Sequence, residues 1–289
     1  MLEFSQEWFV GEEIDGFFVE ETMKRAWAAE LEQLSEIDRI CRENDIRYFA
    51  DWGTLLGAVR HHGFIPWDDD IDIAIPRPDL LRFSEIAARE LPEGWSFHDC
   101  YNTLGYHKML RRVITGDTID FGEKRMKSFH GFPYPVGIDI STIEYLPRDE
   151  EERETLIDMY TITASALSVC QDPASTAEKK EQYYQATEQM LGVNLDRTRD
   201  MPTQLVRLMD AVASMYGPDD SDIVGQLHYI VTGAATPKSE DSYLCGERFE
   251  FENITIPVPY CYDEVLTEWY GDYKIKRRNP SSHDYPFYR

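Results

Sequence analysis

The sequence has few cysteines and few basic side chains. Its five cysteines are widely spaced and form no Cys-x-x-Cys pair, which argues against a disulfide framework and against a zinc site. Its 29 basic side chains are outnumbered by 54 acidic ones, so the formal net charge is −25. Nucleic-acid binding generally requires basic surface that displaces counterions from phosphates, so we expect no nucleic-acid partner.

The sequence also lacks long apolar runs and a basic N-terminal segment. Residues 1–19 contain acidic side chains but no Lys or Arg, which is unlike a signal peptide. The longest apolar-leaning run, near 156–170, is interrupted by Asp158 and is shorter than the roughly 20 residues that span a bilayer. We therefore expect a cytoplasmic protein in a reducing compartment, without a transmembrane segment. Peripheral contact with the inner membrane face is left open.

The length and the apolar fraction predict a substantial core. A chain of 289 residues with 42% apolar side chains can bury most of its unfolded surface. After residue 148 the composition shifts to Glu, Lys, Gln, Ala and Leu, which favours helices. We predict a core over 1–148, a helical insertion or subdomain over 149–240, and C-terminal strands, a helix and a tail that return to the core over 241–289.

Hydrophobic spacing predicts a mixture of helices and strands, hence an α+β fold. Helices are expected at 17–45, 55–62, 79–90 and 262–270, and several more between 149 and 215. Gly63 is expected to end the second of these helices. Strands are expected at 47–51, 70–75, 96–101, 107–115 and 136–145, with a hairpin over 248–258 that turns near Asn253.

The strongest chemical signal is the acidic run within 67–73. On a strand, Asp68, Asp70 and Asp72 point to one face and Asp69 to the other, with about 6–7 Å between neighbouring carboxylates on a face. Such carboxylates repel one another unless they share a cation. Hard oxygen ligands suit Mg²⁺ or Mn²⁺, which also bind substrate phosphates.

Two other interpretations of this acidic run remain open. The first is a solvated acidic loop on an already acidic protein, because short motifs often occur by chance. The second is an EF-hand, whose ligand spacing Asp68, Asp70 and Asp72 match. The EF-hand fits less well because Ile73 stands where that loop requires glycine.

Two other segments add polar groups that suit a phosphate site. Gly53 and Thr54 lie between a predicted strand and a predicted helix, where backbone N–H groups can bind an anion. Asp139 is a lone acid in an apolar strand and, if buried, needs a metal or a partner. An ordinary helix cap and an exposed strand-edge residue are the respective alternatives.

The order of these segments resembles the nucleotidyltransferase fold, and the run 51–73 is similar to the signature of the LicD family. That family contains bacterial phosphocholine transferases and is related to fukutin-type ribitol-phosphate transferases. The resemblance implies a nucleotidyltransferase-like mixed β-sheet core flanked by helices. Further similar blocks are 111–115, 256–259, 264–266, 270–273 and His283.

The resemblance also implies a reaction and its cofactor. A phospho-alcohol, classically phosphocholine, moves from a CDP-activated donor such as CDP-choline to a hydroxyl on a glycan or lipid-linked glycan, and CMP is released. Asp70 and Asp72 match the metal-binding pair, and Asp68 matches an additional acid of some relatives. Asp139 matches the third carboxylate, a metal ligand or the base, so the implied catalytic set is Asp70, Asp72 and Asp139 with Mg²⁺ or Mn²⁺.

Residues for donor binding follow from the same resemblance. Gly53 and Thr54 match the donor-phosphate turn, Arg111 matches a phosphate-contacting arginine, and Lys108 stands one position from a family lysine. Aromatic faces would hold a choline group. The candidates for it are Trp67, Phe64, Tyr106, Phe129 and Tyr134, and His283 is a further site candidate. The alternatives are a nucleotidyltransferase that releases pyrophosphate, and a non-catalytic nucleotide-binding relative.

Overall fold

The computed structural model describes residues 1–278. Its contacts divide the chain into two compact units. The first comprises Met1–Phe97, Arg112–Ser141 and the described residues from 244 to 278, and the second comprises His98–Arg111 and Thr142–Tyr243. These units differ from the predicted boundaries in that the segment 98–111 belongs with the mainly helical part. The three-part division at 148 and 240 stays a prediction.

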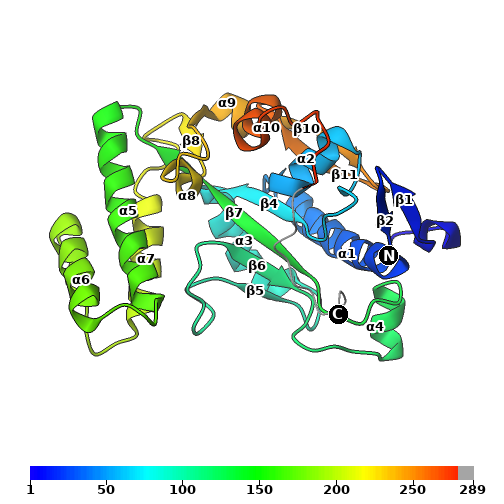
Figure 1. Ribbon diagram of the computed structural model, residues 1–289, viewed down its shortest axis with the longest axis horizontal. Coiled ribbons are helices and arrows are strands. Elements are labelled where there is room, and N and C mark those ends of the chain that lie inside the picture. The colour runs from blue at the N-terminus through cyan, green and yellow to red at the C-terminus, as the bar shows by residue number, and fades with distance from the viewer. Residues whose placement is uncertain (279–289) are drawn as a thin grey trace. The chain divides into compact units, whose positions relative to one another are not determined.

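A mixed sheet forms the centre of the first unit. In spatial order its strands are β3 (Phe49–Ala50), β4 (Asp72–Pro76), β7 (Gly137–Leu146), β6 (Arg111–Ile114) and β5 (Ser96–His98) (Figure 1). β3 and β4 pair antiparallel, with Ala50 opposite Ile73. Fully buried isoleucines at 71, 73 and 75 place β4 in the core. The sheet with its flanking helices confirms the predicted α+β class.

The helices of the first unit are α1 (Glu21–Glu43), α2 (Trp52–Arg60), α3 (Arg77–Glu90), α4 (Glu123–Ser128) and α10 (Tyr262–Tyr270). Among them, α2 and α3 contact β4, and α10 contacts α2. The buried Gln33 side chain of α1 donates a hydrogen bond to the carbonyl of Val113 on β6, with 2.7 Å between the atoms. The indole N–H of Trp27 donates to the carbonyl of Asp68 at 2.9 Å, so α1 also holds the acidic loop.

Two antiparallel ribbons complete the first unit. One consists of β1 (Glu12–Ile14) and β2 (Phe17–Val19). The other, drawn in orange in Figure 1, consists of β10 (Gly246–Phe251) and β11 (Ile254–Pro259). β10 contacts α2 and β11 contacts β3, so the second ribbon supports the strand and helix that precede the acidic loop.

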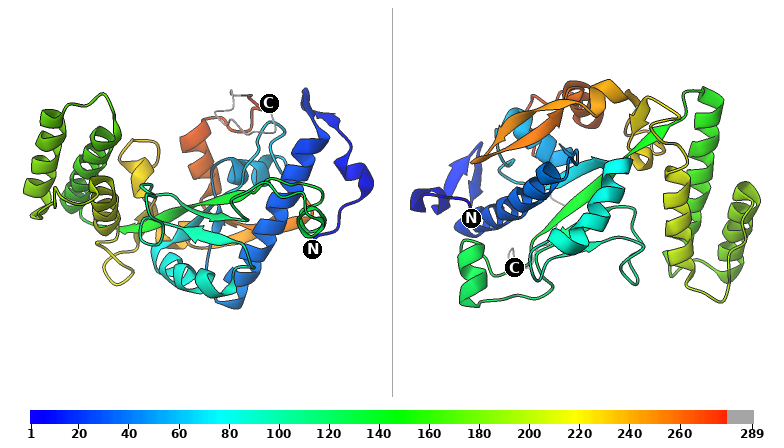
Figure 2. Two further views of the ribbon diagram at one scale, coloured as in Figure 1. Left: turned by 90° about the horizontal axis from the view of Figure 1, so that it is seen from below. Right: turned by 180° about the vertical axis from the view of Figure 1, so that it is seen from behind.

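The second unit is mainly helical. Its three longest helices are α5 (Glu150–Gln171), α6 (Ala177–Leu191) and α7 (Met201–Ala213), and they lie side by side in both figures (Figures 1 and 2). Short elements follow as β8 (Ile223–Gly225), α8 (Leu227–Ile230), β9 (Lys238–Ser239) and α9 (Glu240–Tyr243). β8 pairs with the last residues of β7 and with β9. The several helices predicted between 149 and 215 are thereby confirmed.

Two local predictions were wrong. Residues 17–19 form strand β2, because Asp15 and Gly16 adopt positive φ angles of 52° and 74° and turn the chain into a hairpin. The helix end expected at Gly63 instead has His62 in the left-handed region, with φ 57°. Gly63 is needed for space, since an added Cβ would lie 2.2 Å from a carboxylate oxygen of Glu252.

Two expectations concern membranes and disulfides. Among the helices of residues 1–278, none combines the length and the apolar character that crossing a bilayer demands. All five cysteines have free thiols.

Candidate metal and phosphate site

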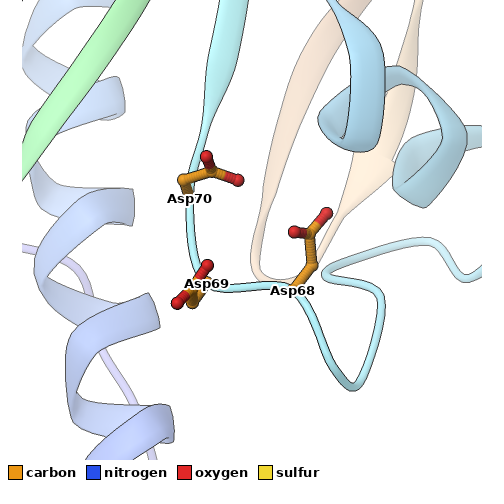
Figure 3. Close-up of side chains that lie close together, drawn as sticks. All are labelled: Asp68, Asp69 and Asp70. Atoms are coloured by element: carbon orange, nitrogen blue, oxygen red, sulfur yellow. The ribbon is translucent and has the colours of Figure 1, made fainter. Parts of the chain in front are cut away.

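The acidic run lies mostly before β4. The strand starts at Asp72, so Asp68–Asp70 belong to a loop, and the predicted alternation of faces was wrong for them. One carboxylate oxygen from each of Asp68, Asp69 and Asp70 lies within 4.8 Å of the others (Figure 3). Side chains of a strand alternate between its two faces, but those of a loop do not, so Asp69 can point the same way as Asp68 and Asp70.

Asp72 shares this acidic region from the start of β4. Burial raises the pKa of its carboxyl well above the ordinary value, and the charges of Asp70, Asp51 and Asp139 raise it further. The Asp72 backbone is fixed on both sides: its N–H donates to the Thr54 hydroxyl at 2.9 Å, and its carbonyl accepts from the Asp51 N–H at 3.0 Å. Neighbouring strands therefore hold several carboxylates where they repel one another.

Gly53 and Thr54 form the first turn of α2 against the acidic loop. A Cβ at Gly53 would lie 2.2 Å from a carboxylate oxygen of Asp68, so only glycine leaves room for that side chain. Thr54 is buried, and its hydroxyl accepts the hydrogen bond from Asp72. The predicted contact of Gly53 and Thr54 with donor phosphate stays a prediction, and the structure adds that both residues position acidic groups.

Asp139 lies on β7 and is bound by an arginine that the sequence argument did not select. Arg112 on β6 donates through Nε and Nη2 to the two carboxylate oxygens, and the Nη2–Oδ2 distance is 2.9 Å. The guanidinium remains 40% exposed and the carboxylate 19% exposed. Asp139 is thus a half-buried carboxylate with an oriented guanidinium beside it.

Arg111, the arginine predicted to contact phosphate, is enclosed within the second unit. Its guanidinium donates to the Met109 carbonyl at 2.8 Å and the Thr142 hydroxyl at 2.7 Å, and it pairs with the carboxylate of Asp210. Both side chains of the pair are only 6% exposed. Through these contacts Arg111 stabilises the packing of the second unit. Lys108, by contrast, is exposed in the preceding loop.

Glu30 on α1 is a further acid of this region that sequence reasoning missed. The residue is only 3% exposed, and its Oε2 atom has no hydrogen-bond partner. Burial raises the pKa of Glu30 well above its ordinary value, and the nearby charges of Asp70 and Asp69 add to the effect. In the sequence it resembles any acid of an amphipathic helix, so only the packing shows that it faces the acidic loop.

Tyr270, at the C-terminal end of α10, was also missed as a site residue. Burial raises the pKa of its phenol, and the charges of Asp68, Asp51 and Asp72 raise it further. These electrostatic contributions place the side chain beside the acidic region. The signal in the sequence was the block 270–273, which the family resemblance included without assigning a role.

Most of the aromatic candidates for a choline group pack elsewhere. Phe64 is buried and stacks on Trp27, with centroids 4.8 Å apart, and Phe129 is covered by the guanidinium of Arg125 at 3.6 Å. Trp67 is half-buried and meets the rings of Phe17 and His61 edge-on. Tyr134 packs against Phe132, and the Tyr106 hydroxyl donates to the Leu110 carbonyl in the second unit. His283 lies outside the described residues.

The residues of this region fit a hard divalent cation. The ligand atoms are all carboxylate oxygens, and three of them already lie within a span that one ion can bridge. The unpartnered Oε2 of the buried Glu30 is a further sign of missing positive charge. The carboxylates that converge are those of Asp68, Asp69 and Asp70, whereas Asp72 and Asp139 are outside this group. The predicted ligand set of Asp68, Asp70, Asp72 and Asp139 stays a prediction.

Comparisons with known proteins point to the same segment. Residues 45–141 match the family model described as LicD/FKTN/FKRP, nucleotidyltransferase domain. The chain is 25% identical to lipopolysaccharide cholinephosphotransferase LicD of Haemophilus influenzae over 252 residues, which are 84% of this chain and 88% of that protein. It is 40% identical to human ribitol 5-phosphate transferase FKRP over 45 residues, which are 16% of this chain and 9% of that protein.

Proposed function

We propose that this phosphotransferase, whose residues 45–141 are similar to the LicD family, transfers phosphocholine from a CDP-activated donor to a glycan hydroxyl. The proposed reaction depends on a divalent metal ion and releases CMP. The acceptor is a glycan or lipid-linked glycan, and the proposed place is the cytoplasm, including the inner membrane face. The observation that carries the proposal is the convergence of Asp68, Asp69 and Asp70 within 4.8 Å, beside Asp72, in the matched segment.

The similarity to a cholinephosphotransferase supports the choice of substrate. That relative aligns with most of this chain and most of its own length, whereas the ribitol-phosphate transferase aligns over a short segment. Both relatives are named for the transfer of a phosphorylated alcohol. The segment that matches the family model, residues 45–141, contains the acidic loop, so the same chemistry is proposed for the carboxylates here.

The proposed reaction is a displacement at phosphorus. The oxygen of the acceptor hydroxyl forms a bond to the phosphorus that carries the alcohol, and the bond from that phosphorus to the CMP oxygen breaks. CMP leaves with the electron pair, and the hydroxyl proton passes to a base. Asp139 is the proposed third carboxylate, as the base or as a metal ligand, and Arg112 fixes its orientation.

Charge neutralisation must be local, because the whole protein repels an anionic donor. The net charge is −25, but salt screens exposed charges beyond about 8 Å. One pair of opposite charges at 4 Å contributes about 4 kcal/mol near a protein surface. A bound Mg²⁺ or Mn²⁺ supplies this compensation to the donor diphosphate. Asp70 and Asp72 would hold the ion. Asp68, whose carboxylate occupies the room left by the missing Cβ of Gly53, would be a further ligand.

A product assay tests the proposal directly. The protein and Mg²⁺ are incubated with CDP-choline, CDP-ethanolamine or CDP-ribitol, and CMP is followed by chromatography and phosphorus NMR. We expect CMP from CDP-choline, and a loss of about 10³-fold or more in Asp70→Asn. Asp219→Asn, a change at an exposed acid of the second unit, is the matched control and should retain full activity.

Two results would contradict the proposal. Undiminished CMP release by Asp70→Asn would remove the carboxylates from the reaction, provided that circular dichroism shows an unchanged fold. Release of pyrophosphate from a nucleoside triphosphate, without CMP from any CDP-alcohol, would assign nucleotidyl transfer instead.

A further inference from the structure

Three aromatic rings meet next to the acidic loop, where α2 begins and α10 ends. Trp52 and Trp269 are stacked, with centroids 4.2 Å apart and planes inclined by 10°. The Tyr270 ring stands nearly perpendicular to both, at 88° to Trp52 and 80° to Trp269, with centroids 6.5 Å away in each case. The three half-buried rings form a corner, which we call the aromatic corner.

The aromatic corner is maintained against two unfavourable features. Trp52 has φ of 41°, a left-handed conformation that a bulky side chain rarely adopts. The indole N–H of Trp269 is buried without a hydrogen-bond partner. Backbone strain and unpaired polar groups are retained mainly where the surrounding structure or a ligand requires them.

The charges that face the aromatic corner are predominantly negative. Burial raises the pKa of the Tyr270 phenol, and the charges of Asp68, Asp51 and Asp72 raise it further. Arg60 is the nearby cation, and its guanidinium is directed to the Tyr273 carbonyl at 2.7 Å. Aromatic faces with carboxylates behind them attract a cation more strongly than a neutral group.

We propose that Trp52, Trp269 and Tyr270 bind the quaternary ammonium of the donor and thereby select a cationic alcohol. This inference rests on the proposed function, which it deepens by assigning the subsite for the transferred group. A quaternary ammonium donates no hydrogen bonds, so flat aromatic faces suit it. A polyol such as ribitol needs polar partners, which the faces of these rings do not provide.

Binding measurements can isolate the contribution of the positive charge. Calorimetry compares phosphocholine with 3,3-dimethylbutyl phosphate, in which carbon replaces the ammonium nitrogen, and with CMP. We expect the native protein to bind phosphocholine at least tenfold more tightly than the neutral analogue. Trp269→Leu should reduce this ratio to near one, while Trp269→Phe and Tyr270→Phe, which keep the rings, should retain most of it.

Tyr260→Leu is the matched control, because Tyr260 is a largely exposed aromatic residue just before α10. It should leave the ratio unchanged. An unchanged ratio in a folded Trp269→Leu protein would overturn the inference. Equal weakening of CMP and phosphocholine would also overturn it, since the corner would then bind the pyrimidine ring.

The failure of this inference differs from the failure of the proposed function. If CDP-choline and CDP-ribitol yield CMP equally well, with no effect of Trp269→Leu, phospho-alcohol transfer stands and the aromatic corner is not the selective element. If no CDP-alcohol yields CMP while phosphocholine still binds in preference to its analogue, the subsite stands and the proposed reaction fails.

Discussion

Arg111 and Arg112 are adjacent on β6, yet each meets an aspartate in a different environment. The Arg111–Asp210 pair belongs to the second unit, where both side chains are 6% exposed. The Arg112–Asp139 pair belongs to the first unit, where the arginine is 40% exposed and the aspartate 19% exposed. One residue of displacement along a strand reverses the direction of the side chain. The same residue type therefore serves the fold at one position and remains accessible to a ligand at the next.

The energies of the two pairs should differ accordingly. Both partners of a buried pair have lost their hydration, so removing one leaves an uncompensated charge in a poorly solvated place. A half-exposed pair regains water when one partner is removed, and it contributes little to stability. The environment of each pair thus predicts whether a substitution affects folding or activity.

The largest effect on stability is expected at Arg111. Arg111→Met leaves Asp210 buried without its charge partner, and we expect the free energy of unfolding to fall by about 3–5 kcal/mol. Guanidinium chloride denaturation followed by circular dichroism measures this change. Arg112→Met is the matched control and should stay within about 1 kcal/mol of the native protein. If the double variant Arg111→Met/Asp210→Leu recovers most of the lost stability, the uncompensated charge of Asp210 is the cause. Similar losses in Arg111→Met and Arg112→Met would contradict the predicted difference between the two pairs.

The next largest effect is expected at Gly53, which lies against the acidic loop of the first unit. In Gly53→Ala the new methyl group meets the carboxylate of Asp68, which must move. We expect activity to fall about 10²-fold, or about 2.7 kcal/mol, because metal ligands act only in their fitted positions. Gly217→Ala is the control, since its Cβ would lie 3.7 Å from the nearest side-chain atom. Steady-state CMP release measures both variants, and full activity in Gly53→Ala would show that Asp68 can move without consequence.

His61 is a buried titratable group of a different kind, because it is placed among cations. Its side chain is 6% exposed, and burial together with Arg60 and Lys276 lowers its pKa to about 4, although Asp15 opposes the shift. The unfolded chain therefore binds the proton more readily, so the contribution of His61 to stability is complete above about pH 6.5 and is lost as the pH falls towards 4.

Replacement of His61 should remove this pH dependence. Between pH 7 and pH 5 we expect the native protein to lose roughly 2 kcal/mol more than His61→Gln, from about 1.4 kcal/mol per pKa unit. Denaturation of both proteins at the two pH values measures this difference. The carboxylates are the same in both proteins, so the effect of their titration cancels. Equal losses in the two proteins would mean that the ring is protonated without penalty in the folded state.

The sequence predicted element types better than it predicted which side chains converge. Regular apolar spacing identified α3, β4 and α10, because periodic burial is a local property. The faces of Asp68 and Asp70 were misjudged because the strand begins only at Asp72. Nothing local in the sequence indicates that Arg111 packs against Asp210, which is 99 residues away along the chain. The predicted contact of Arg111 with phosphate stays a prediction. Glu30 gave no signal, because burial of one acid in a helix depends on the partner surface.

The smallest predicted effect concerns catalysis at Arg112. Arg112→Met removes the group that orients Asp139, and we expect kcat/KM for the CDP-alcohol to fall about tenfold, which corresponds to about 1.4 kcal/mol. Arg112→Lys keeps the charge but loses the two-pronged contact, so it should recover only part of the activity. A fall in kcat would indicate that the orientation of Asp139 matters in the transition state, whereas a rise in KM alone would indicate that Arg112 binds the donor. Unchanged kinetics together with a lower free energy of unfolding would contradict this prediction. Arg112 would then stabilise the fold, as Arg111 does, and would not act in the reaction.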